Sequence, residues 1–301
     1  MMTIELPANT QQRSRYKVPA LSIDLSALGA EVLDPSSDFD EDFPVETCNL
    51  GKLSTMASAA LTDGLAGICL GSSFLLRSDL HLRDCRLDAV RAALKLTSRI
   101  TGPIYASVTG DAVGETALEA VKDSDVGLEI HLNKQDLDSA LDLVARAKEA
   151  GTRVVVALTG DTAQQIDLSK LGAVVDTVRL REPDPHTARE IRYSLRSAAL
   201  EEGRDLTVVA DLFMIVSACA MDAEERANLI SAIGADRYAA GSARVLGTVH
   251  DVADHIESWI ALGAADAFTI LPGSLPTDLA STVCGVLPLL NARRTVEAQQ
   301  Q

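Results

Sequence analysis

The sequence predicts an α/β protein folded as a (β/α)8 TIM barrel, and three observations support this fold class. Eight short apolar segments alternate with stretches of helical periodicity. Turn residues separate the segments, and no hairpin signal competes with the alternation. With 301 residues, 47% of them hydrophobic, the chain is long enough to bury one core of this size. A doubly wound open sheet is the alternative, but eight strand–helix units fit a closed barrel better.

The expected strands are short and apolar, and a helical pattern follows each of them. They cover residues 20–28, 65–71, 104–108, 126–132, 153–158, 174–180, 206–216 and 267–271. The helix expected over 135–150 has a pattern typical of the expected helices. It carries Leu137, Leu141 and Val144 on one face, and Gly151 ends it.

The end of the chain has the pattern of a helix, a strand and a closing helix. An extra helical segment is expected over 222–244. Thr248 is a suitable N-cap for the next helix, which Gly263 ends. The expected organisation is a flexible N-terminal tail over 1–17, one barrel domain over 18–293 and a C-terminal tail over 294–301.

Composition excludes several classes of partner. The formal net charge of −16 argues against nucleic acid and against an anionic membrane surface, since both require basic patches. No apolar run is long enough to cross a bilayer, and the polar N-terminus lacks a signal core, so a cytoplasmic protein is expected. The five cysteines show no paired spacing, so neither a disulfide nor a metal site is expected.

Candidate catalytic residues lie where the predicted strands end, because the active site of a TIM barrel lies at the carboxyl ends of its strands. Glu129 and His131 alternate along one strand and therefore share a face. A buried glutamate and histidine cost desolvation free energy unless they are paired, so we expect them to be catalytic. The alternative is a structural pair that closes the barrel.

Further charges belong to the same end of the predicted barrel. Asp211 lies inside an apolar strand, and Arg179 and Arg181 share a face of the strand before it. The two arginines are expected either to neutralise Asp211 or to bind an anionic ligand. A structural ion pair is the more common outcome in a barrel interior.

Residues 247–259 carry the pattern GT-x-x-x-VAD-x-I-x-x-W, which Gly263, Phe268 and Pro272 follow at fixed distances. This order resembles the C-terminal end of the bacterial luciferase-like, flavin-dependent monooxygenases, and the chain is similar to a short, divergent member of that family. Residues 86–100 and 189–204 extend the resemblance through the middle of the chain. It implies a TIM barrel that uses reduced FMN or F420.

The resemblance also implies where the cofactor binds. The family often carries a turn of small residues at the position of Thr159, Gly160 and Thr162, where hydroxyls and amides hold the flavin phosphate. These three residues are therefore expected to bind cofactor, together with Ser107 and Thr109 on the third strand. Asp161 departs from the pattern, since a carboxylate repels phosphate. Asp161 as the N-cap of the next helix is the alternative.

The activity implied by the resemblance is the oxidation of a small organic substrate. The resemblance also implies a homodimer or heterodimer, and a flavin reductase as partner. The chain departs from the family in lacking its long insertions and in having only 3% aromatic residues. These departures leave open a non-catalytic flavin-binding or partner-subunit barrel. A cofactor-independent lyase or isomerase is the third hypothesis, with Glu129, His131 and Asp211 as its acid–base groups.

Overall fold

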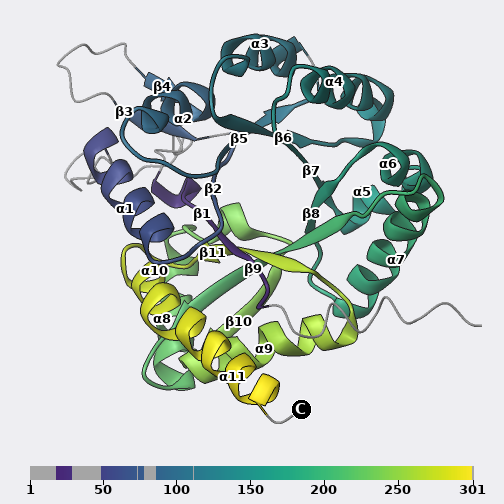
Figure 1. The fold of residues 1–301 in the computed structure, drawn as a ribbon. Helices are drawn as coiled ribbons and strands as arrows, with labels where there is room; N and C mark the ends of the chain where they lie inside the picture. The colour runs from purple at the N-terminus through teal and green to yellow at the C-terminus, as the bar shows by residue number, and fades with distance from the viewer. Residues whose placement is uncertain (1–17, 29–48, 73, 78–85, 111, 300–301) are drawn as a thin grey trace, which may run out of the picture.

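The computed structural model describes residues 18–28, 49–72, 74–77, 86–110 and 112–299, and it confirms the predicted TIM barrel (Figure 1). Within these residues, eight parallel strands close into a ring in which each strand pairs with the next. In ring order they are β1 (Leu21–Asp24), β2 (Ile68–Leu70), β5 (Ile104–Thr109), β6 (Val126–His131), β7 (Val154–Thr159), β8 (Thr177–Arg181), β9 (Thr207–Val216) and β11 (Ala267–Pro272).

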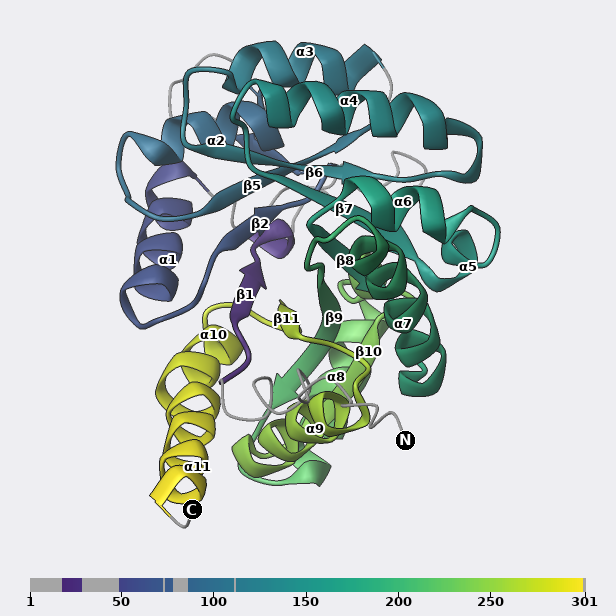
Figure 2. The same cartoon turned by 45° about the vertical axis from the view of Figure 1, so that its right-hand side comes forward.

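Helices surround the ring, as the alternating pattern predicts (Figure 1). They are α1 (Leu50–Thr62), α2 (Ala89–Thr97), α3 (Ala112–Val121), α4 (Leu137–Glu149), α5 (Gly160–Ala163), α6 (Leu168–Val174), α7 (Pro185–Glu201), α8 (Ala220–Ala232), α9 (Val249–Leu262), α10 (Thr277–Ser281) and α11 (Leu287–Gln299). Figure 2 shows α3 and α4 over β5, β6 and β7, and α8 and α9 near β9 and β10.

The sequence signals at the ends of α9 act as expected. The Thr248 hydroxyl accepts a hydrogen bond from the Asp251 amide, and the Asp251 carboxylate accepts one from the Thr248 amide, which makes a capping box. At the other end, Gly263 has a φ of 77°, a left-handed conformation that favours glycine. These local bonds fix where α9 begins and ends, and the chain after Gly263 leads into β11, which pairs with β1.

The expected helical segment over 222–244 is only partly correct. Helix α8 ends at Ala232, and the chain then forms an additional strand, β10 (Ala243–Gly247), parallel to the second half of β9. The reason lies in the length of β9, which has ten residues. Its first residues pair with β8, and its backbone groups beyond that point need another partner, which β10 supplies.

A small antiparallel hairpin is a second departure from the sequence expectation. Strands β3 (Leu75–Arg77) and β4 (Arg86–Asp88) pair outside the ring. Helix α2 starts directly after β4, at Ala89, and the Asp88 side chain caps it by accepting from the Arg91 amide at 2.8 Å.

Two tails were expected, one at each end of the chain. The N-terminal tail expected over 1–17 lies outside the described residues. At the other end, α11 runs past residue 293 to Gln299. None of the helices in the described residues has the length and apolarity that a membrane crossing requires.

The apolar core has two parts. The larger part lies between the barrel wall and the surrounding helices. The smaller part packs Phe213 and Ile215 of β9 and Leu271 of β11 against Ala223 and Ala227 of α8. Because Phe213 and Ile215 lie on the same face of β9 as Asp211, α8 covers that face beyond Asp211. This sector of the barrel's carboxyl end is therefore filled with apolar side chains.

Candidate functional site

The barrel interior contains a buried charged layer, which we define as Asp24, Glu129, Arg179 and Asp211. The guanidinium of Arg179 donates from Nε to Asp211 at 2.5 Å, from Nη1 to Glu129 at 2.8 Å and from Nη2 to Asp24 at 2.8 Å. The exposed fraction of each of the four residues is 4% or less. They come from β1, β6, β8 and β9, so one arginine connects four strands across the ring.

A second arginine joins the layer from the carboxyl end. Arg181 donates from Nε to Asp211 at 2.8 Å and from Nη1 to the Tyr238 carbonyl at 3.0 Å. Both arginines therefore neutralise Asp211, which agrees with the structural ion pair that we expected as the more common outcome. Three carboxylates and two guanidinium groups leave this region with one formal negative charge.

The pKa of Glu129 reflects these contacts. Desolvation is the largest single influence and raises the pKa of this carboxyl, and the charge of Arg179 is the largest influence that lowers it. Hydrogen bonds from His131 and Ser107 lower the pKa further, to well below the usual value of a glutamate. Burial would also lower the pKa of Arg179, but Asp211, Glu129 and Asp24 raise it well above its usual value. Glu129 is therefore an anion that only accepts hydrogen bonds.

His131 ends β6 above this carboxylate, and 39% of its side chain is exposed. Its Nε2 lies 3.0 Å from Oε1 of Glu129, and the Ser107 hydroxyl donates to the same oxygen at 2.6 Å. Since the ionised Glu129 has no proton to offer, Nε2 of His131 must carry the hydrogen. Nδ1 is then the ring nitrogen available as a proton acceptor.

The expected cofactor-binding residues on β5 have different positions. Ser107 is buried, and its hydroxyl donates a hydrogen bond to the Glu129 carboxylate, so it helps to hold that carboxylate in place. Thr109 is one inward step further and lies opposite His131 in the β5–β6 register. The structure thus brings Ser107, Glu129 and His131 into contact and places Thr109 beside them.

The expected phosphate turn is the start of α5, a helix of four residues. Thr159, not Asp161, is its N-cap: the Thr159 hydroxyl accepts from the Thr162 amide at 3.1 Å and lies 3.0 Å from the Thr162 hydroxyl. A Cβ on Gly160 would lie 1.7 Å from Oε2 of Glu182. The Glu182 carboxylate thus lies in the space next to Gly160, where a phosphate would meet like charge, so the residues of this turn do not fit that group.

Two contributors to the site were not singled out from the sequence. Asp24 is the one acidic residue in the apolar run from Ala20 to Leu25, and this signal could have identified it as it identified Asp211. Tyr238 approaches from the connection between α8 and β10, and its hydroxyl donates to the Pro272 carbonyl at 2.5 Å. No periodic pattern marks that contact.

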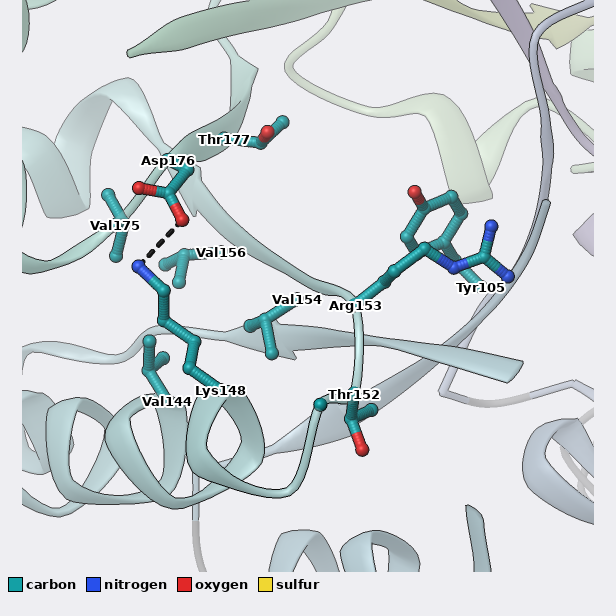
Figure 3. A pocket seen from close by; sticks show the side chains of 11 residues that line it. Tyr105, Val144, Lys148, Thr152, Arg153, Val154, Val156, Val175, Asp176 and Thr177 are labelled. Carbon is teal, nitrogen blue, oxygen red and sulfur yellow. Dashed lines mark ion pairs between the residues drawn. The ribbon is translucent and has the colours of Figure 1, made fainter. Parts of the chain in front are cut away.

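A surface pocket of about 360 Å³ lies at the opposite end of the barrel, at the amino ends of β7 and β8 (Figure 3). Its rim carries an ion pair of 2.6 Å between Lys148 and Asp176, and Arg153 lies over the Tyr105 ring. The charged layer and His131 do not line it. We therefore place the candidate site at the carboxyl end, where titratable groups converge, and not at this pocket.

Within the described residues, no group of three or more histidine, cysteine, aspartate or glutamate side chains has an arrangement that could hold a metal ion. The three carboxylates of the charged layer converge on Arg179 instead. Cys69, Cys219 and Cys284 are free thiols.

Comparison with models of protein families and with curated proteins finds no match. Solved structures do match. An EDTA monooxygenase from Chelativorans sp. BNC1 has a TM-score of 0.66 at 13% identity and covers 91% of this chain and 94% of its own. A riboflavin lyase with modified FMN and substrate riboflavin has a TM-score of 0.66 at 13% identity, covering 92% of both chains.

A third structure, an F420-dependent secondary alcohol dehydrogenase with an F420–acetone adduct, has a TM-score of 0.58 at 9% identity. It covers 88% of this chain and 96% of its own. The chain thus has the TIM-barrel fold of the bacterial luciferase-like flavin- and F420-dependent enzymes. The resemblance predicted from residues 247–259 is confirmed at the level of the fold.

Proposed function

We propose that the protein is a luciferase-like oxidoreductase that binds reduced FMN, or the deazaflavin F420, at the carboxyl end of the barrel and acts on a small organic substrate there, with dioxygen as the oxidant when the cofactor is reduced FMN. One observation carries the proposal beyond the fold. The end of the barrel that holds the active site in this architecture presents His131 on an ionised, immobilised Glu129. A flavin-type ring, when bound, supplies the reducing equivalents, which no protein side chain provides.

The residues of the carboxyl end divide into two groups with respect to such a ring. Thr109 and His131 are register partners where β5 and β6 end, and Arg181 lies opposite Thr159 where β7 and β8 end, so a ring at the barrel mouth would contact these strand ends. The β7–α5 turn does not fit the phosphate, because the Glu182 carboxylate lies against Gly160. The proposal therefore rests on the ring end of the site.

His131 is the residue to which we assign proton transfer. Glu129 holds Nε2–H, and the half-exposed ring presents Nδ1 as the acceptor. Arg179 and Ser107 keep Glu129 ionised and fixed, so they are positioning residues for His131.

The geometry does not favour the lyase or isomerase hypothesis. Besides His131, that hypothesis uses Glu129 and Asp211 as groups that exchange protons with a substrate. Each is 1% exposed, and each is bound to Arg179. The lowered pKa of Glu129 also makes it a weak base and keeps it from donating a proton near pH 7.

An anaerobic titration tests the proposal. Oxidised and reduced FMN and F420 are added to the protein, and the absorption spectrum of the ring is followed. The expected result is a saturable spectral change for at least one cofactor. Absence of any change with both cofactors in both redox states would show the proposed function to be wrong.

Turnover separates an enzyme from a non-catalytic flavin-binding barrel. Reduced cofactor, supplied by a flavin reductase, is mixed with oxygen and a panel of small organic substrates, and substrate loss is measured. We expect His131→Gln to lower turnover on the order of a hundredfold while flavin binding changes little. His250→Gln is the matched control, because His250 is exposed on α9 and outside the site. Equal turnover of all three proteins would remove His131 from the mechanism.

A further inference from the structure

Glu182 occupies the turn where the fold resemblance places a cofactor phosphate. Its Oε2 lies against Gly160, 1.7 Å from the position a Cβ would take. Its Oε1 accepts a hydrogen bond from the Asp184 amide at 2.9 Å. The carboxylate is therefore held in place by the chain that leads into α7, and not merely directed towards the turn.

Strand pairing makes this contact a built-in feature of the fold. Thr159 and Arg181 are register partners on β7 and β8, so the next residues, Gly160 and Glu182, leave neighbouring strands side by side. The absence of a side chain on Gly160 provides the space. Glu182 uses that space within the protein itself.

The hydroxyls of Thr159 and Thr162 and the Thr162 amide are also engaged in hydrogen bonds within the turn. The Thr162 amide donates to the Thr159 hydroxyl, which lies within hydrogen-bond distance of the Thr162 hydroxyl as well. A phosphate would have to displace these bonds in addition to the Glu182 carboxylate. Asp161 adds a second, exposed carboxylate next to Gly160, so a phosphate dianion would meet like charge as well as occupied space.

We infer that Glu182 takes the place of the cofactor's phosphate at the β7–α5 turn, so that the barrel selects its flavin by the ring and gains nothing from a phosphate. This inference rests on the proposed function and narrows its ligand class. The preferred ligand is an isoalloxazine without a phosphate at this turn, and riboflavin binds at least as tightly as FMN.

The test compares the dissociation constants of riboflavin and FMN, which share one ring and differ only in the phosphate. Both are measured by quenching of flavin fluorescence for the wild type, Glu182→Ala and Glu182→Gln. Glu149→Gln is the matched control, since Glu149 is an exposed glutamate at the end of α4. Circular dichroism and denaturation midpoints show that all four proteins are folded.

In the wild type, we expect FMN to bind no more tightly than riboflavin. Glu182→Ala opens the space and removes the charge, so the preference should shift towards FMN by about tenfold or more. Glu182→Gln removes the charge but keeps the volume, and should shift the preference by less. Glu149→Gln should leave the preference unchanged.

Two results would overturn the inference and leave the proposed function in place. One is a wild type that binds FMN at least tenfold more tightly than riboflavin. The other is an FMN preference that is the same in the wild type and in both Glu182 variants. If neither flavin binds to any of the proteins, the proposed function fails, and the inference fails with it.

Discussion

Replacing Arg179 by methionine tests whether the charged layer holds the barrel together. The variant leaves Asp24, Glu129 and Asp211 buried without the guanidinium that now bonds to all three. Arg181 remains on Asp211 and so limits the loss. Removing one partner of a buried ion pair typically lowers the free energy of unfolding by about 3–5 kcal/mol. We expect Arg179→Met to cause a loss of this size, although Arg179 bonds to three carboxylates.

Urea denaturation at pH 7, followed by the fluorescence of the single tryptophan, measures this loss. Trp259 is 2% exposed and packs edge-on against Phe268 of β11, so its emission reports on the barrel wall. The control is Arg146→Met, which removes an exposed ion pair with Glu115. The control should leave the midpoint unchanged because solvent screens such a pair.

The effect of pH has a defined sign. In the wild type, the folded pKa of Glu129 is below its unfolded value of about 4.3, so its contribution is present above that pH and is lost as the pH falls through the folded pKa. Without Arg179, burial should raise the folded pKa above the unfolded value, and the variant then loses stability as the pH rises.

The difference in free energy of unfolding between wild type and Arg179→Met should therefore be largest near pH 7 and shrink towards pH ~4. Two outcomes would refute the reasoning. One is a loss no larger than that of Arg146→Met. The other is a difference that stays constant from pH 7 to pH ~4.

Two further predictions concern packing and assembly. Gly172→Ala places a methyl group 2.5 Å from the Leu195 carbonyl oxygen and 2.8 Å from the Ala198 Cβ, so it should push α6 away from α7. We expect the free energy of unfolding, measured by urea denaturation, to fall by about 1–3 kcal/mol. An unchanged denaturation midpoint would contradict the close packing of the two helices. Because the predicted dimer implies a second copy or a related subunit, sedimentation velocity at micromolar concentration should show a species of twice the monomer mass, alone or after mixing with a related chain. A monomer under both conditions would count against the dimer.

Much of the fold follows from local patterns. The apolar strands and the 3.6-residue period of α4 and α9 need only neighbouring residues, and Gly263 ends α9 for a purely conformational reason. Strand β10 is different, because residues 243–247 become a strand only where β9 continues beyond β8. That continuation depends on tertiary structure, which no local pattern reports.

In the candidate site, too, some features follow from local patterns and others depend on tertiary structure. Alternation along β6 was sufficient to place Glu129 and His131 on one face. Alternation does not say which residues meet across the ring, so the central position of Arg179 among Asp24, Glu129 and Asp211 was not predicted. The contact of Glu182 with Gly160 joins the ends of neighbouring strands, and it depends on a side-chain direction that the sequence does not specify.

The central claim is that a flavin-type ring binds at the carboxyl end of the barrel, above the charged layer. Backbone hydrogen exchange with and without saturating riboflavin or FMN measures this directly. We expect slower exchange where β6 and β8 end, in peptides that contain His131 and Glu182, and unchanged exchange around Lys148 and Asp176 at the opposite end. Protection confined to Lys148 and Asp176, with none at His131, would contradict it.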